Sequence, residues 1–274
     1  MQSGLLERLR RYRRTRIARP RDWIKQPFLD AQRTVNRALA SALPARTPRP
    51  LPNVILSIVL VRRNRLGDAV NVLPLIAALK ESYPGVRIGV CASTYNAPVF
   101  ARSALIDALY AVPDKFYGSR WLVRWHPAVR AMRAARYDVA VNASAAFSSK
   151  AAMLVHHANT RYTAGVAAPA GSIYNRIYDH ADRPGKQDLD RHQVLRVAGV
   201  MRRAGLQLGR LPELGSAIGL DRRGVVMQPS IAICPDVNRD DSAWPLLHWQ
   251  ALVAHLRERY SDHRLRLVLA SPQS

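Results

Sequence analysis

The chain alternates short, continuous apolar runs with longer segments in which apolar residues recur every three or four positions. The apolar runs lie at residues 53–61, 86–92, 104–112, 137–143 and 160–166. A continuous apolar run is typical of a strand whose two faces are both covered, as in a parallel sheet. Between and after these runs, the pattern predicts helices at 68–83, 95–103, 120–135, 145–157 and 189–204, with a loop-like stretch at 167–187. Strands alternating with helices indicate βαβ units around one parallel sheet.

Shifts in composition divide the chain into four parts. We expect a basic amphipathic extension and linker at 1–50, a Rossmann-like domain at 51–205, an interdomain linker at 206–230 and the start of a second α/β domain at 231–274. The last part holds a single strand–helix–strand series, and one such unit cannot bury both faces of its sheet. The pattern therefore predicts an α/β fold whose second α/β domain is incomplete.

The charge of the chain is strongly positive. Its 42 lysines and arginines against 19 acidic residues give a net charge of +23, and residues 1–50 alone carry +10. Such a field attracts nucleic acids, anionic membranes or phosphorylated substrates. Within 1–50 the apolar residues recur at helical spacing, which predicts basic amphipathic helices on an anionic membrane surface; a flexible basic tail, or a helix packed on the domain, is the open alternative. Few aromatic residues are interleaved with the arginines, so we expect no specific nucleic-acid partner.

Other patterns restrict the function further. No apolar stretch reaches the roughly 18 to 20 residues that cross a bilayer, and no secretory signal is present, so we expect a cytoplasmic protein, peripheral on the inner membrane. The histidines lack the spacing of metal ligands, so no metal site is expected. Paired tryptophans at helical spacing favour core or interface packing; these are Trp121, Trp125, Trp244 and Trp249.

Candidate site residues crowd the junction between the first strand and the first helix, in the sequence LVRRNRLGDAV. They are Arg62, Arg63, Asn64, Arg65, Gly67 and Asp68. Ligands of open α/β sheets bind beyond the carboxyl ends of the strands, which is where this junction lies. Asp68 is either a helix cap or a catalytic carboxylate. After the strand at 137–143, four polar residues either line the same cleft or cap a helix: Ser144, Ser148, Ser149 and Lys150.

The segment ILSIVLVRRNRLGDAVNVLPLIAALKESYPGVRIGV resembles the opening of glycosyltransferase family 9, the bacterial lipopolysaccharide heptosyltransferases. In that family a strand is followed by an arginine, a short turn, Gly-Asp and a helix with an early proline. The later segment ICPDVNRDDSAWPLLHWQALVAHLRER resembles the start of the family's second domain, where a strand ends in Pro and a Trp-Pro pair precedes an amphipathic helix.

This resemblance implies a GT-B-like fold and metal-independent glycosyl transfer with inversion. The donor would be a nucleotide sugar, ADP-heptose, which is a substrate, so no cofactor is expected, and the acceptor would be the lipopolysaccharide core. Asp68 would be the general base, and Arg62, Arg63, Asn64, Arg65 and Gly67 would bind the acceptor. The donor-binding candidates are Pro235, Arg239, Ser242 and Trp244.

Two departures from the family leave alternatives open. Ser242 stands where the family usually has a lysine, and the family's glycine-rich and adenine-binding segments, which follow the last strand, have no counterpart here. The first alternative is therefore a truncated, catalytically inactive relative that only binds the acceptor. The second is a basic protein that binds nucleic acid without sequence preference.

Overall fold

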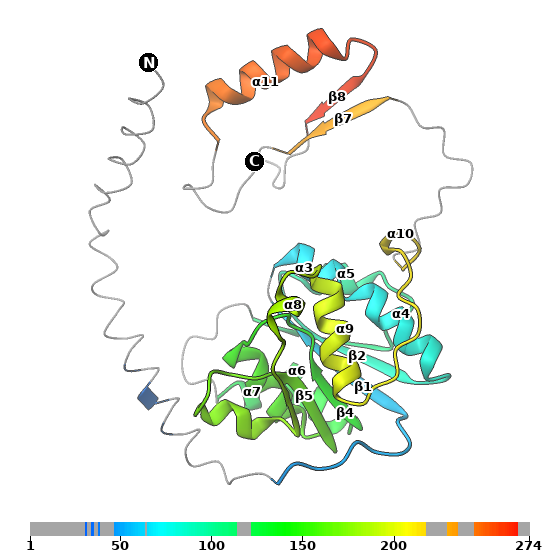
Figure 1. The fold of residues 1–274 in the computed structure, drawn as a ribbon, viewed down its shortest axis with the longest axis vertical. Helices are drawn as coiled ribbons and strands as arrows, with labels where there is room; N and C mark the ends of the chain where they lie inside the picture. The colour runs from blue at the N-terminus through cyan, green and yellow to red at the C-terminus, as the bar shows by residue number, and fades with distance from the viewer. Residues whose placement is uncertain are drawn as a thin grey trace. The chain divides into compact units, whose positions relative to one another are not determined.

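A computed structural model describes residues 31, 34–35, 38, 47–63, 65–113, 122–217, 229–234 and 244–267. The chain divides into two compact units, Met1–Leu220 and Asp221–Ser274 (Figure 1). Most of the amphipathic segment predicted at 1–50 lies outside the described residues.

A parallel sheet forms the centre of the first unit. Its six strands are β1 (Ser57–Arg62), β2 (Arg87–Ser93), β3 (Ala108–Val112), β4 (Val139–Asn142), β5 (Tyr162–Val166) and β6 (His180–Asp182). They lie in the order β3-β2-β1-β4-β5-β6, and every neighbouring pair is parallel. The predicted parallel α/β sheet is confirmed. The strand order reverses direction between β1 and β4, and that crevice is where open α/β sheets bind ligands.

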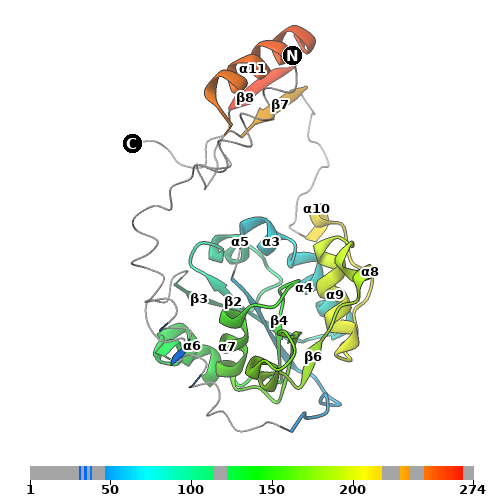
Figure 2. The same ribbon diagram turned by 60° about the vertical axis from the view of Figure 1, so that its left-hand side comes forward.

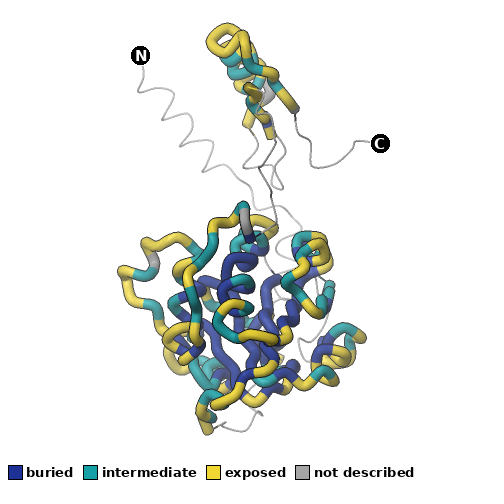
Figure 3. Tube along the Cα trace, turned by 90° about the vertical axis from the view of Figure 1, so that its right-hand side faces the viewer, coloured by how far each residue is buried: buried dark blue, intermediate teal, exposed yellow. Residues whose placement is uncertain are grey.

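Helices cover both faces of this sheet. They are α3 (Leu66–Val70), α4 (Leu73–Ser82), α5 (Ala97–Ala101), α6 (Pro127–Ala134), α7 (Ser149–Ala158), α8 (Lys186–Leu189), α9 (Gln193–Arg203) and α10 (Leu214–Ala217), with 3-10 turns η1 (Leu122–Trp125) and η2 (Ile173–Ile177). Alternate residues of β1 serve opposite cores: Ile58 and Leu60 pack with α4, α5 and α9, whereas Val59 and Val61 pack with α6 and α7. Figure 2 shows these helices around the sheet. The strands are consequently the most deeply buried part of this unit (Figure 3).

The prediction of one helix at 68–83 was wrong, because the segment forms α3 and α4. Pro74 is the reason: it has no N–H to donate and its ring clashes with the carbonyl four residues earlier, so a new helix begins at Leu73. Pro127 likewise starts α6 after η1, with His126 as the N-cap, which divides the helix predicted at 120–135. The stretch 167–187, predicted as a loop, contains η2 and the three-residue strand β6.

The second unit contains one βαβ series, as the sequence predicts. Strands β7 (Ser230–Ile233) and β8 (Arg264–Leu267) are parallel, and α11 (Leu246–Arg259) connects them. Much of α11 is exposed; Leu247, for example, is 75% exposed. Within the described residues of both units, no helix has the length and apolarity to cross a membrane.

Candidate active site

A pocket of about 280 Å³ opens at the carboxyl ends of β1 and β4. Its polar lining comes from three separate segments: the β1–α3 junction, the loop after β4 and the start of α9. These polar residues are Arg62, Arg65, Asp68, Ser144, Ser148, Gln193 and Arg196. The pocket therefore lies at the point where the strand order reverses, and the described part of its lining combines one carboxylate with three guanidinium groups.

The central contact in this pocket is an ion pair between Arg62 and Asp68. The Arg62 side chain is only 3% exposed, whereas that of Asp68 is 24% exposed. Arg62 Nη1 also donates to the carbonyl of Ala143, 3.0 Å away, which ties the end of β1 to the loop after β4. Burial lowers the pKa of Arg62, and the negative charge of Asp68 opposes that shift. Arg62 holds Asp68 Oδ2, and the described residues offer Asp68 no further partner, so Oδ1 is available to a ligand.

The backbone places Asp68 inside α3 and not at its N-cap. Arg65 occupies the N-cap position and makes no side-chain capping bond, and Asp68 lies in the first turn, where a negative charge is favourable. Arg65 has φ 52° and ψ 128°, in a region that non-glycine residues rarely adopt and that costs on the order of 1–3 kcal/mol. By contrast, a side chain added at Gly67 would meet nothing within 4 Å. The strained residue of this turn is therefore Arg65, and the turn places its side chain in the pocket lining.

The structure brings together some of the predicted site residues and separates others. Arg62, Arg65 and Asp68 all line the pocket. Arg63 is buried and its Nη2 donates to the carbonyl of Pro113, 2.8 Å away, so it connects the ends of β1 and β3. Asn64 lies outside the described residues.

Two residues of α9 complete the pocket, and sequence reasoning missed both. Gln193 is the first residue of α9, and Arg196 follows one turn later, with no hydrogen-bond partner for its buried Nε among the described atoms. The available signal was their position: a helix that follows a parallel strand begins at the edge where that strand ends. Ser148 serves both roles considered for it, because it lines the pocket and its Oγ accepts from Ala151 N, 3.3 Å away, at the start of α7.

Buried polar groups hold the loop after β4 in place. Asn142 Nδ2 donates to Tyr178 Oη at 2.9 Å, and Asn142 Oδ1 accepts from the backbone N–H of Ser144 at 3.2 Å. Burial raises the pKa of Tyr178, so the phenol remains protonated. The Tyr178 ring lies against Gly165, where an added Cβ would be 2.7 Å from ring atoms. This close packing fixes Asn142 and, through it, the pocket wall at Ser144.

The predicted donor residues are only partly described. Pro235, Arg239 and Ser242 lie outside the described residues. Trp244 lies in the second unit, is 48% exposed and contacts Trp249 edge to face, with 5.0 Å between ring centroids. Trp244 and Trp125, which is 59% exposed, therefore do not lie in a core, and the alternative that they pack at an interface stays a prediction. The described residues contain no cluster of three or more metal-ligating side chains.

Comparisons with known proteins identify the fold. Escherichia coli heptosyltransferase WaaC, solved with ADP, superimposes with a TM-score of 0.62 at 19% identity, covering 79% of this chain and 67% of that chain. The chain has the heptosyltransferase fold. WaaC solved with ADP-2-deoxy-2-fluoro heptose gives a TM-score of 0.59 at 19% identity and covers 79% of this chain and 70% of that chain. A family 9 glycosyl transferase from Veillonella parvula gives a TM-score of 0.54 at 14% identity and covers 82% of this chain and 72% of that chain.

Sequence comparison supports the same relationship over a shorter stretch. The chain is 30% identical over 77 residues to lipopolysaccharide heptosyltransferase 3 of Escherichia coli, a match that spans 28% of this chain and 23% of that relative. No family model matches the chain. The resemblance predicted from the sequence is confirmed, and so is the predicted GT-B-like α/β class.

Proposed function

We propose that the chain is a family 9 glycosyltransferase that transfers heptose from ADP-heptose to a hydroxyl of the lipopolysaccharide core. The observation that carries the proposal is the pocket at the ends of β1 and β4, where a buried guanidinium holds one carboxylate and two further guanidinium groups line the same pocket. The similarity to heptosyltransferases in fold and in part of the sequence supports heptosyl transfer as the reaction.

Asp68 is the proposed general base. Its Oδ1 takes the proton from the acceptor hydroxyl while the oxygen of that hydroxyl bonds to the anomeric carbon of the donor. The bond from that carbon to the donor phosphate breaks, and the electron pair leaves with the nucleoside diphosphate. Attack from the opposite side of the leaving group inverts the anomeric centre. Arg62 contributes by fixing the carboxylate, which keeps Oδ1 in position before the acceptor arrives.

Arg65 and Arg196 are the proposed acceptor-binding cations. Both line the pocket beside Asp68, and guanidinium groups bind phosphate and carboxylate groups through paired hydrogen bonds. An acceptor rich in acidic or phosphorylated sugars fits this charge. Gln193 and Ser144 add uncharged hydrogen-bonding groups for sugar hydroxyls.

The test is a transfer assay with ADP-heptose and a heptose-free core oligosaccharide. We expect a product heavier by one heptose, with the anomeric configuration inverted relative to the donor, as read by mass spectrometry and NMR. Arg196→Gln should raise KM for the acceptor by about tenfold or more, because a hydrogen bond to a charged group contributes roughly 1.5–3 kcal/mol.

Arg202→Gln on the same helix is the matched control, because Arg202 is exposed and does not line the pocket. Its KM should stay within about twofold, as expected for a surface substitution. Acceptor binding without any product would contradict transfer and favour the alternative of a binding protein. A chain that neither binds the acceptor nor forms product would refute the proposal altogether.

A further inference from the structure

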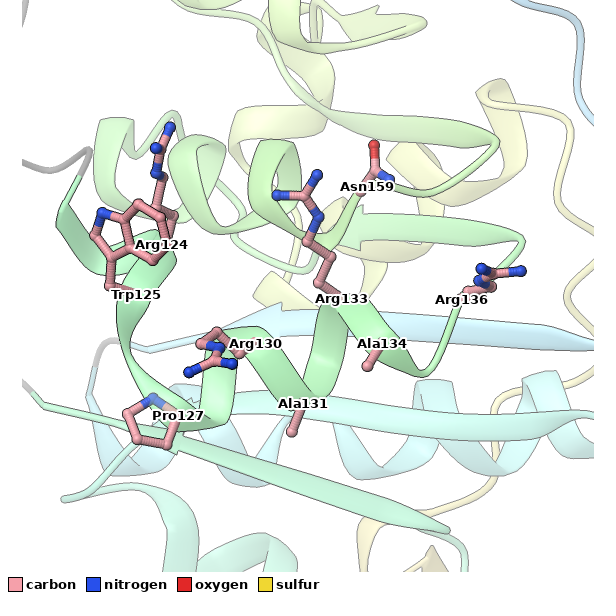
Figure 4. Close-up of a pocket in the computed structure, with 9 residues that line it drawn as sticks. All are labelled: Arg124, Trp125, Pro127, Arg130, Ala131, Arg133, Ala134, Arg136 and Asn159. Carbon is pink, nitrogen blue, oxygen red and sulfur yellow. The ribbon is translucent and has the colours of Figure 1, made fainter.

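A second pocket, of about 980 Å³, lies on the flank of the first unit formed by η1, α6 and the end of α7 (Figure 4). It shares no lining residue with the candidate active site. Its polar lining consists of Arg124, Arg130, Arg133, Arg136 and Asn159, with the indole of Trp125 beside them. We call this lining the α6 basic pocket.

The four arginines of the α6 basic pocket are spread along the whole length of α6. Arg124 precedes the helix, Arg130 and Arg133 lie within it, and Arg136 follows it. Since α6 has eight residues, the helix is about 12 Å long, and the row extends beyond both of its ends. Figure 4 shows Arg133 directed toward Asn159 at the end of α7, with Arg124 and Arg136 toward opposite ends of the pocket. A row of this length suits several phosphate groups better than one.

Among the described residues, no carboxylate neutralises the positive charge in this pocket. No acidic residue of the described part of the chain lines it, and none of its four arginines forms an ion pair with another described residue. The field reaches the adjacent α7, where the pKa of His157 is lowered to about 3, first by burial and then by the positive charges of His156, Arg124 and Arg133. A cluster of exposed cations without counter-charges is favourable only when an anion approaches it.

Trp125 gives the pocket an apolar element at its rim. The side chain is 59% exposed, and the Arg124 guanidinium carbon lies 4.4 Å from the ring centroid. Tryptophan is enriched at the level of lipid headgroups, where its apolar ring and polar N–H suit the boundary between water and hydrocarbon. A soluble phosphate ligand would gain little from an exposed indole, whereas a lipid surface would gain from both the ring and the arginines.

We propose that the α6 basic pocket docks the protein on anionic phospholipids, with its arginines on lipid phosphates and Trp125 at headgroup level. The inference is independent of the proposed transfer reaction, because it uses another surface and other residues. It also differs from the membrane contact predicted for residues 1–50, since it places a membrane-binding surface on the folded domain.

The experiment measures sedimentation of the full chain with vesicles of phosphatidylglycerol and phosphatidylcholine in equal parts. Arg130→Gln/Arg133→Gln should weaken partitioning by about 30-fold, because each basic residue near an anionic surface contributes roughly fivefold. Arg257→Gln/Arg259→Gln on α11 removes the same charge from exposed positions outside the pocket and should change partitioning by less than about twofold. Trp125→Ala should weaken the binding that persists at high salt, where the arginine contribution is screened.

Three outcomes would overturn the proposal. The first is an equal loss in the two double variants, which would mean that the vesicles detect only net charge. The second is absence of vesicle binding by the unaltered chain. The third is that the pocket variant loses affinity for inorganic pyrophosphate or for a single-stranded oligonucleotide while its vesicle binding is unchanged, which would assign the pocket to a soluble phosphate or to nucleic acid.

Discussion

Replacing Asp68 by alanine should destabilise the first unit as well as impair any transfer. Asp68 is the ion-pair partner of Arg62, which is 3% exposed. Among the described residues, Arg62 keeps only its bond to the carbonyl of Ala143 when the carboxylate is removed. The variant would therefore leave a buried cation without a counter-charge. For this reason, lost activity in Asp68→Ala alone would not identify a general base.

The size of this destabilisation follows from the exposed fractions of the Arg62 and Asp68 side chains. Removing one partner of a buried ion pair costs about 3–5 kcal/mol. Asp68 is 24% exposed, so water can enter the vacated space, and we expect about 2–3 kcal/mol, or a fall in Tm of very roughly 4–12 °C. In Arg62→Met/Asp68→Ala, an apolar side chain replaces the stranded cation, and a coupling energy of about 2 kcal/mol should appear between the two sites.

The assay is urea unfolding of both single variants and the double variant, followed by tryptophan fluorescence. Arg191→Met is the control, because it removes an arginine that is 59% exposed from a 3.9 Å pair with Asp188, and Asp188 keeps its pair with Arg203. It should cost less than about 0.5 kcal/mol. A coupling energy below about 0.5 kcal/mol would show that Arg62 and Asp68 act independently, and the reasoning that Arg62 positions the carboxylate would fail.

Three further predictions follow from other parts of the first unit. Arg65→Gly should raise the free energy of unfolding by about 1 kcal/mol because it relieves the strained backbone at φ 52°, and it should weaken acceptor binding measured by calorimetry. A lower free energy of unfolding would show that the backbone at Arg65 is not strained. Gly165→Ala should lower the free energy of unfolding by about 1–3 kcal/mol in denaturant titrations, because its Cβ meets the Tyr178 ring. Gly67→Ala, with open space around it, should raise that free energy by about 0.5–1 kcal/mol, and equal effects of the two variants would contradict the close packing at Gly165. Because the pKa of His157 is lowered to about 3 in the fold, its contribution to the free energy of unfolding should be fully present above pH 6.5 and fall by about 1.4 kcal/mol per pH unit below that value. His157→Gln should reduce this slope in urea titrations at several pH values, and an unchanged slope would exclude His157 as its source.

Hydrophobic pattern predicted the sheet of the first unit well because its strands are buried on both faces. Ile58 to Val61 are all fully buried, so the run reads as apolar throughout. The short strand β6, with the sequence HAD, has no such signal, since it lies at the edge of the sheet and Asp182 is buried through its pairing with Arg203 at 2.7 Å.

Apart from Ser144 and Ser148, which were considered for the same cleft, the candidate site was predicted only where its residues are adjacent in sequence. Arg62, Arg65 and Asp68 lie within one junction and could be found from their spacing. Arg196 is distant in the chain, and only the arrangement of α9 beside β5 brings it to the same pocket. Arg63 follows Arg62 directly and carries the same charge, yet its Nη2 bonds to the carbonyl of Pro113 and the residue does not line the pocket, which the sequence alone does not reveal.

The most direct test of the account is kcat for Asp68→Asn in the transfer assay. The amide keeps an oxygen that can accept from Arg62, so the fold and acceptor KM should stay close to those of the unaltered chain, while kcat falls by about 10²–10⁴ because the base is gone. An Asp68→Asn variant that transfers heptose at the unaltered rate would contradict the assignment of Asp68 as the base.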